Sequence, residues 1–425
     1  MRIGIVGGGI SGLTAARLLA RGHQVELFER ETHAGGHAHT ALVPTASGEI
    51  PVDTGFIVYN ETTYPGFSAM LRELQVPTQP SDMSFGCRCL ACGLEYSTRG
   101  AAGFFAQHGR ILRPRHWRLL ADLRAFFVDA RRMLDTGGNE EQTLGQYLSS
   151  SRWRGRGSDL GGHFLVPLSA AVWSTAPAEV LDFPLTYLLR FLSNHGLIGF
   201  GRSLEWRTVR GGSREYVRRL LAELPAAAVQ LSTAVAAVSP LPDGSVEIHL
   251  SRGDRRRFDR VILATHADQA LSLLAGAGPV EQRALGGFRY TSNRVVLHTD
   301  PSTLPRLSDA RASWNVATAD CIPTANMLSM TYDLTRLQSL GGPDRLLVSV
   351  NPGPLETRRV IAEFSYAHPR YGHDTLAAQR GVAAIQGTRG VYFAGAHLGY
   401  GFHEDGHRSG VEVAALIAAE QRVAA

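Results

Sequence analysis

Residues 2–20 read RIGIVGGGISGLTAARLLA, and this stretch decides the fold. An apolar run, Arg2–Val6, leads into a glycine turn and then into apolar residues at helical spacing. In such a turn Gly7 permits the tight bend, Gly9 lets the backbone approach a diphosphate, and Gly12 lets the helix pack closely on the strand. The helix N-terminus then faces the phosphates. We therefore predict a strand, a nucleotide-binding turn and a helix.

A second predicted strand, His23–Phe28, ends in Glu29. The carboxylate of Glu29 follows Gly12 by 17 residues, which suits a pair of ribose hydroxyls. The sequence thus contains, in this order and at the expected spacing, a strand, the glycine turn, a helix, a second strand and a terminal acid. This order predicts a Rossmann-like unit that binds a dinucleotide.

The bound dinucleotide could be NAD or FAD, and the segment after Glu29 distinguishes between them. It contains the glycine pair Gly35-Gly36 followed by His37, and later the run VDTGFI at 52–57. Here the sequence resembles the FAD-dependent oxidoreductase superfamily of flavin amine oxidases, protoporphyrinogen oxidase and phytoene desaturases. His37 stands where those families usually have arginine. The resemblance implies that 52–57 passes close to the isoalloxazine ring, where Gly55 would permit a close approach.

Further blocks extend this resemblance. Residues 210–213, 229–238 and 260–265 resemble the middle of the FAD domain, in which Val235 would meet the adenine through its backbone. Residues 391–406 resemble the final strand, glycine turn and helix start. The cofactor-binding residues implied are Gly7, Gly9, Ile10, Ser11, Gly12, Glu29, Arg30, Gly35, Gly36, His37, Gly55, Phe56, Ile57, Val235, Gly395, Ala396, His403, Asp405 and Gly406.

A narrower resemblance covers nearly the whole chain. The stretches HTDPSTLPR at 298–306, FSYAHP at 364–369 and GYGFHEDG at 399–406 resemble bacterial NAD/FAD-binding proteins often found beside cyclopropane-fatty-acyl synthase-like methyltransferases. This resemblance implies a fatty-acyl or lipid-like substrate. It also suggests a methyltransferase partner.

The blocks are separated along the chain, so one domain must be assembled from discontinuous segments. We predict an α/β protein with a Rossmann-like FAD-binding domain from 1–64, 206–289 and 376–425. The insertions, 65–205 and 290–375, would form an α+β substrate-binding domain.

Two apolar periodicities inside the insertions predict helices. The first, at 117–134, carries four arginines on its polar side, and Arg115 precedes it by two residues. These charges indicate a solvated face or a peripheral membrane contact. The second, at 183–192, indicates either core or the lining of an apolar substrate tunnel.

Composition excludes several classes of function. All 43 basic residues are arginine, which excludes lysine Schiff bases and the lysine that flavin amine oxidases typically place near N5. The net charge of +5 is spread over 425 residues and favours no nucleic-acid partner. Four cysteines and the absence of a long apolar run predict a reduced, cytoplasmic protein without a membrane span.

The resemblance places four catalytic candidates near the ring: His403, Glu404, Tyr400 and Tyr59. Histidine suits acid or base chemistry near neutral pH. We expect an FAD enzyme that dehydrogenates or isomerises an apolar substrate by hydride transfer to flavin N5. The alternative is a flavin amine oxidase that releases hydrogen peroxide. A third hypothesis is a protein that keeps the flavin as a structural or sensory ligand without turnover.

Three cysteines crowd together as Cys87, Cys89 and Cys92. A tetrahedral zinc site would need a fourth ligand, such as His108 or Cys321, and the paired CxxC spacing of zinc-binding domains is missing. We therefore predict ordinary loop cysteines and no metal.

Overall fold

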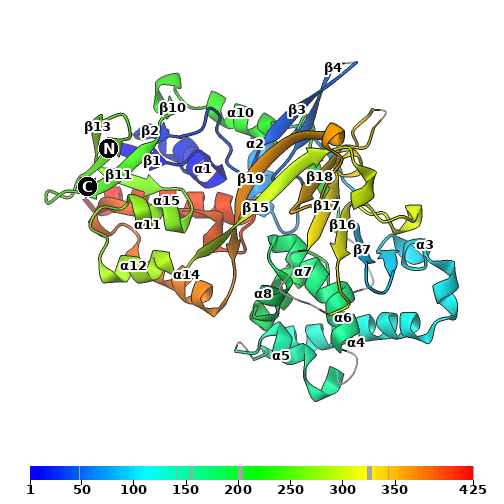
Figure 1. Cartoon of the computed structure of the whole chain (residues 1–425). Coiled ribbons are helices and arrows are strands. Elements are labelled where there is room, and N and C mark those ends of the chain that lie inside the picture. Colours follow the sequence, from blue (N-terminus) through cyan, green and yellow to red (C-terminus); the bar gives the residue numbers. More distant parts are fainter. Residues whose placement is uncertain are drawn as a thin grey trace.

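Two sheets organise the chain, one in each lobe of Figure 1. The structure is a computed structural model, and it describes residues 1–46, 48–139, 141–153, 157–199, 204–322, 328–342 and 344–424. The first sheet is parallel and has the order β10-β2-β1-β14-β20. Its strands are β1 (Arg2–Val6), β2 (Gln24–Phe28), β10 (Val229–Gln230), β14 (Arg260–Leu263) and β20 (Val391–Phe393).

Helices and a small sheet bury both faces of this parallel sheet. Helix α1 (Ile10–Leu19) packs beside α15 (His403–Ala424), although the two are separated by most of the chain. On the other face lie β11 (Val235–Pro240), β12 (Val246–Leu250) and β13 (Arg255–Phe258). Burial on both faces explains the continuous apolar runs in the sequence. The predicted α/β class and Rossmann-like unit are confirmed.

The second sheet lies in the other lobe and is mostly antiparallel. Its order is β19-β15-β18-β17-β16-β7-β8, with β7 and β16 parallel to each other. The strands are β7 (Phe85–Cys89), β8 (Glu95–Ser97), β15 (Arg289–His298), β16 (Trp314–Thr318), β17 (Ser329–Asp333), β18 (Leu347–Val350) and β19 (Val360–Arg370). Helices packed against it, most of those labelled lying below it in Figure 1, complete one large apolar core. They are α3 (Gly100–Phe104), α4 (Pro114–Thr136), α5 (Leu144–Leu148), α6 (Gly157–Leu160), α7 (Val166–Trp173), α8 (Pro177–Leu181) and α9 (Leu185–Asn194).

One predicted domain boundary shifts. Helix α2 (Pro65–Glu73) packs against α15, and its Phe67 and Leu71 belong to the same core as Ile3 and Leu13 of the nucleotide-binding sheet. The boundary drawn between residues 64 and 65 therefore lies after α2. An apolar helix face joins whichever core it can reach, which local periodicity cannot tell.

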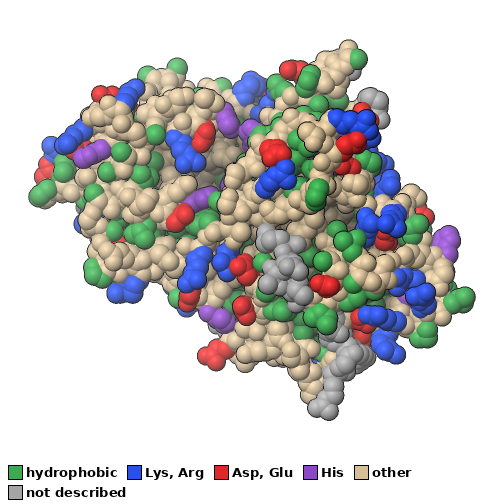
Figure 2. Space-filling view, in the orientation of Figure 1, with side chains coloured by type: hydrophobic (Ala, Val, Ile, Leu, Met, Phe, Trp, Pro, Cys, Tyr) green, Lys and Arg blue, Asp and Glu red, His purple; other side chains and the backbone are tan. Residues whose placement is uncertain are grey.

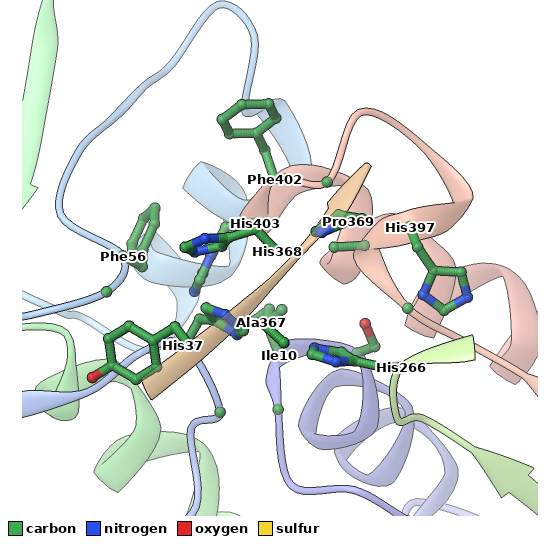
Figure 3. A pocket seen from close by; sticks show the side chains of 18 of the residues that line it. Ile10, His37, Phe56, His266, Ala367, His368, Pro369, His397, Phe402 and His403 are labelled. Atoms are coloured by element: carbon green, nitrogen blue, oxygen red, sulfur yellow. The ribbon is translucent and has the colours of Figure 1, made fainter. Parts of the chain in front are cut away.

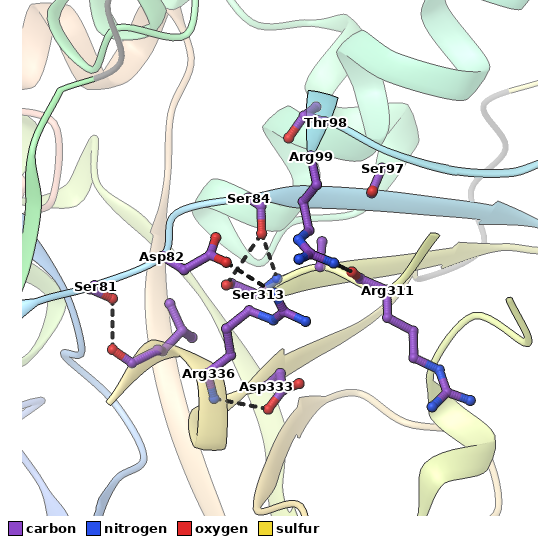
Figure 4. A network of polar contacts seen from close by, with 12 residues as sticks. Ser81, Asp82, Ser84, Ser97, Thr98, Arg99, Arg311, Ser313, Asp333 and Arg336 are labelled. Atoms are coloured by element: carbon purple, nitrogen blue, oxygen red, sulfur yellow. Dashed lines mark hydrogen bonds and ion pairs between the residues drawn. The ribbon is translucent and has the colours of Figure 1, made fainter. Parts of the chain in front are cut away.

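Buried polar contacts connect the lobes. Asp53, at the end of the hairpin β3 (Thr40–Thr45) and β4 (Gly48–Asp53), accepts hydrogen bonds from Ser213 N at 2.8 Å and Gln338 Nε2 at 3.0 Å. Within the second lobe, a partly exposed network, in Figure 4, joins Asp82 to Arg336 at 3.0 Å before β7 begins. This ion pair helps to hold the entry of β7 in place.

The surface carries charges of both signs, as Figure 2 shows for one face. Helix α4 follows the 117–134 prediction, with Leu123 and Phe127 buried and its arginines exposed. Just before it Leu112 is 87% exposed. Among the described residues, no helix is both long and apolar enough to cross a membrane.

Candidate active site

A cavity of about 880 Å³ runs between the lobes. Its nucleotide end is formed by the glycine turn, Glu29 and Val235, and its other end by aromatic and aliphatic side chains of the second lobe. Sixteen of the predicted cofactor-binding residues line it: Gly7, Gly9, Ile10, Ser11, Glu29, Arg30, Gly35, Gly36, His37, Gly55, Phe56, Ile57, Val235, Gly395, Ala396 and His403.

The glycine turn has the geometry its spacing predicts. Gly7 has a φ of +108°, a conformation that side chains disfavour. A Cβ on Gly12 would lie 2.0 Å from the carbonyl oxygen of Gly7, so only glycine permits this helix to start here. A Cβ on Gly9 would meet no atom within 4 Å, because Gly9 faces the cavity.

Two helix N-termini meet at this end of the cavity. Helix α1 begins at Ile10 and α15 at His403, and both residues line the cavity. Their close approach needs glycine on α15, since a Cβ on Gly406 would lie 2.6 Å from Ile10 Cγ2 and one on Gly410 would lie 2.5 Å from the Ser11 carbonyl oxygen. Two positive helix ends thus face one space, which favours an anionic group there.

Glu29 also orders the turn itself. Its Oε2 accepts a hydrogen bond from Gly8 N at 2.8 Å, and its Oε1 accepts one from Glu31 N at 3.0 Å. The carboxylate is therefore held at the cavity wall by the backbone on both sides. This position suits the ribose role that the sequence predicts.

A group of histidines surrounds the middle of the cavity, as Figure 3 shows for His37, His266, His368, His397 and His403. The ring centroid of His37 lies 5.4 Å from that of His368 and 5.9 Å from that of His266. Burial lowers the pKa of His37 and His266 to about 4 and that of His368 and His397 to about 3. These imidazoles are therefore neutral at pH 7.

Two of these imidazoles keep a free polar atom. His37 Nε2 and His397 Nε2 are buried and have no hydrogen-bond partner. An unpartnered buried polar atom is costly, so both nitrogens are suited to contact a bound polar ligand. His37 thus takes a cavity position where the resembled families use arginine, but with a neutral donor or acceptor.

His403 is the predicted catalytic residue that lines the cavity. Its ring stacks on Phe56 with centroids 3.6 Å apart, and its Nε2 lies 3.0 Å from the Tyr216 hydroxyl. Burial lowers the pKa of His403 well below its ordinary value. A neutral imidazole with one nitrogen fixed by a phenol is oriented to hold or move a proton at the other.

The structure gives the other catalytic candidates different surroundings. Glu404 accepts hydrogen bonds from the backbone N–H groups of Gly66 and Phe67 at 3.0 and 2.8 Å, which caps helix α2. Tyr59 is 2% exposed and packs in the core. Tyr400 contacts Tyr187 with ring centroids 4.7 Å apart. None of the three is among the described residues that line the cavity.

The other three residues predicted to bind the cofactor, Asp405, Gly12 and Gly406, are not among the described residues that line the cavity. Asp405 accepts a hydrogen bond from Phe402 N at 3.1 Å at the start of α15, while Gly12 and Gly406 permit the close packing of the helices. These three residues therefore shape the backbone around the cavity.

Several lining residues were not predicted. His266 directly follows the segment 260–265 and His368 lies within the segment 364–369, but nothing in the sequence places them opposite His37. The apolar wall was missed as a set, and it comprises Met83, Val172, Trp173, Leu197, Trp206, Val295, Trp314, Tyr332 and Val350. Of the 183–192 prediction, Phe191 lines the cavity and the rest of that stretch lies outside its described lining.

Comparison with known proteins gives the class. The sequence profile of the family described as flavin containing amine oxidoreductase matches residues 10–346. The chain belongs to this family and is a flavin-dependent oxidoreductase.

Two solved structures share its fold, and a third protein matches a short segment of its sequence. Over 98% of both chains it resembles a CLA-producing fatty acid isomerase from P. acnes, with a TM-score of 0.68 and 15% identity. Over 99% of both chains it resembles cyclohexylamine oxidase from Brevibacterium oxydans IH-35A, with a TM-score of 0.67 and 16% identity. A bilirubin reductase from Mediterraneibacter gnavus (strain CC55_001C) is 42% identical over 50 residues, only 12% of this chain and 8% of that protein.

Proposed function

We propose that this chain binds FAD and dehydrogenates or isomerises an apolar, fatty-acyl or lipid-like substrate by hydride transfer to flavin N5. The observation that carries the substrate class is the uncharged wall of the cavity. Every described lining residue from the second lobe is apolar, aromatic, a hydroxyl residue or a histidine. Burial lowers the pKa of His195 to about 4 and of His368 to about 3, so neither is charged at pH 7.

The residues present fit FAD. The paired helix ends at Ile10 and His403 suit a diphosphate, and Glu29 suits a ribose. The free nitrogens His37 Nε2 and His397 Nε2 give polar contacts farther along the cavity. When bound, the flavin supplies the hydride acceptor.

The chain's own residues would then position the substrate and handle its protons. The apolar wall, with Trp173 and Trp314, would exclude water from the reacting carbon. Neutral His403, held by Tyr216, would accept or return a proton beside it. In an isomerisation the hydride returns to the product, whereas in a dehydrogenation it passes to dioxygen or another carrier.

Amine oxidation is the second candidate function, since the family and several structural neighbours favour it. An amine is cationic at neutral pH, however, and the described wall of the second lobe offers no carboxylate. The chain also has no lysine to stand near the ring. The lipid assignment draws further support from the fold shared with a fatty acid isomerase.

The test is an anaerobic titration of the flavin-loaded protein with unsaturated and methylated fatty-acyl lipids and with a panel of amines. We expect a lipid either to bleach the flavin absorption band or to emerge with a moved double bond, read by mass spectrometry. Bleaching by an amine alone, with peroxide on readmission of air, would replace the lipid assignment with amine oxidation. A preparation that takes up no FAD would overturn the proposal.

A further inference from the structure

Four side chains of types that can bind a metal converge in the second lobe, and none of them is among the described residues that line the cavity. They are Cys89, Cys92, His163 and Cys321, and their ligand atoms all lie within 4.8 Å of one another. Cys89 Sγ lies 3.6 Å from Cys321 Sγ, and Cys92 Sγ lies 3.6 Å from His163 Nε2. The four residues come from three segments separated by more than 70 residues of chain each.

The Cys89–Cys321 and Cys92–His163 distances fit a tetrahedral zinc ion. Zinc bonds of about 2.3 Å to sulfur and about 2.1 Å to nitrogen place two thiolates about 3.8 Å apart and a thiolate and an imidazole nitrogen about 3.6 Å apart. Both observed distances agree with this to within 0.2 Å. A disulfide would use two of the thiols and leave the third thiol and His163 without a role.

A second layer of residues orients His163. The ring nitrogen away from the thiols, Nδ1, lies 3.6 Å from a carboxylate oxygen of Asp159, and the ring also bonds to the Asp159 backbone. Two guanidinium nitrogens of Arg115 donate hydrogen bonds to that carboxylate. Metal-binding histidines commonly have such a partner, because it fixes the tautomer that leaves Nε2 free for the metal.

The backbone is shaped to bring the segments together. His163 lies in a π-helical turn, Gly161–Leu165, of the kind often found at functional sites. A Cβ on Gly162 would lie 1.8 Å from the carbonyl oxygen of Cys321, so only glycine lets this turn approach the Cys321 loop. Gly93 follows Cys92 with a φ of +64°, which turns the chain immediately after the second thiol.

We propose that Cys89, Cys92, Cys321 and His163 bind one Zn²⁺ ion in a closed structural site. Three thiolates and Zn²⁺ carry a net charge of −1, and Arg110 and Arg115 stand beside the site to balance it. Arg110 Nη2 donates a hydrogen bond to the Cys92 carbonyl oxygen at 2.9 Å. Four protein ligands leave no open position, so the ion holds structure and performs no catalysis.

This proposal departs from the prediction of ordinary loop cysteines and no metal. Cys321 is one of the two fourth ligands considered from the sequence, but His163 replaces His108, which lies outside the group. Cys87 also lies outside it, fully buried in the core. The spacing in sequence could not show that a π-helical turn would supply the imidazole.

The ion would brace the wall of the cavity. Each segment that supplies a ligand has a lining residue at its other end, namely Met83 before β7, Trp314 at the start of β16 and Trp173 at the end of α7. The parallel pair β7 and β16 thus has the cavity at one end and the proposed ion at the other. The zinc proposal stands independently of the proposed reaction.

The test begins with metal content. The full chain is produced with added zinc, purified in reducing buffer without chelator and measured by elemental mass spectrometry. We expect one zinc per chain in the wild type, less than a tenth of that in Cys92→Ala and Cys321→Ala, and full occupancy in the matched control Cys87→Ala. Replacement by Co²⁺ should give the intense visible bands of a tetrahedral thiolate site, a readout that needs no variant to fold.

A chelator supplies the second measurement. Removing zinc should lower the melting temperature of the wild type by at least about 5 °C, with no change in Cys92→Ala. A wild type that holds no stoichiometric metal after incubation with zinc, or a disulfide between Cys89 and Cys321 under reducing conditions, would overturn the proposal. Iron in place of zinc would overturn the assignment of the metal.

Discussion

The two ends of the cavity are built by different means. The nucleotide end is shaped by backbone: the bend at Gly7, the open face of Gly9 and the helix ends at Ile10 and His403. The proposed substrate end is lined by side chains such as Trp173 and Trp314. Backbone geometry tolerates few substitutions, whereas an apolar wall changes shape with each one. The cofactor end is therefore restrictive, and the substrate end is where specificity is set.

The largest expected effect is at the backbone end. Gly12→Ala would force a methyl group to within 2.0 Å of the Gly7 carbonyl oxygen, so the turn must open. We expect complete loss of bound flavin and destabilisation by about 3 kcal/mol, because overpacking against backbone cannot relax easily. Flavin absorbance and chemical denaturation measure both. The control is Gly22→Ala, whose Cβ meets nothing within 4 Å and which should behave as wild type.

A substitution of His403, which lies between the two ends of the cavity, tests its proposed role in proton transfer. His403→Gln should reduce the rate of flavin reduction by substrate about 10³-fold, within the range for loss of a general acid or base, while leaving the flavin bound. Stopped-flow absorbance gives the rate and its pH profile. His407→Gln on the same helix, outside the described lining, serves as the matched control. Equal rates for both variants would remove His403 from the chemistry.

The histidine group predicts how stability depends on pH. Burial depresses the pKa of His368 to about 3, below its ordinary value, so the unfolded state binds more protons than the folded state as pH falls below about 6.5. The ligand-free protein should therefore lose stability between pH 6.5 and pH 4, by up to about 3 kcal/mol for each such imidazole. Denaturation at several pH values measures this loss. His368→Gln should flatten the curve, and an unchanged slope would contradict the assignment.

A milder substitution, at Gly9, separates the effect on cofactor binding from the effect on folding stability. Gly9→Ala places a methyl group in open space, so we expect unchanged stability. The same methyl group would obstruct the diphosphate, and FAD affinity should fall about tenfold, equivalent to about 1.4 kcal/mol. Fluorescence titration of the ligand-free protein with FAD provides the measurement. Loss of stability without loss of affinity would place Gly9 away from the cofactor.

The smallest expected effect concerns the outer surface of the substrate lobe, where we propose a weak peripheral membrane contact. Ile111, Leu112 and Trp117 are 43%, 87% and 49% exposed next to the arginines of α4. Leu112→Ser should reduce sedimentation with anionic phospholipid vesicles about threefold. Val280→Ser, 54% exposed on the other lobe, is the control. The methyltransferase partner remains a prediction from resemblance.

Prediction from the sequence succeeded where chemistry is local. The positions of Gly7, Gly9 and Gly12 are set by bond geometry within one turn, and Glu29 follows at the end of the next strand. Such short-range constraints produce a fixed spacing of residues that can be recognised in the sequence. The resemblance also placed Glu404 near the ring, but in the structure its carboxylate caps helix α2, a contact that depends on the tertiary fold.

The sequence by itself therefore determined the nucleotide-binding turn, the assembly of one domain from separate segments and the absence of lysine chemistry. Only the tertiary structure decided which histidines meet His37, which side chains form the uncharged wall, and that His163 joins the three thiols. Those groups are distant in sequence and become neighbours through strand pairing and core packing. Contacts of that kind depend on the whole fold, so no local pattern records them.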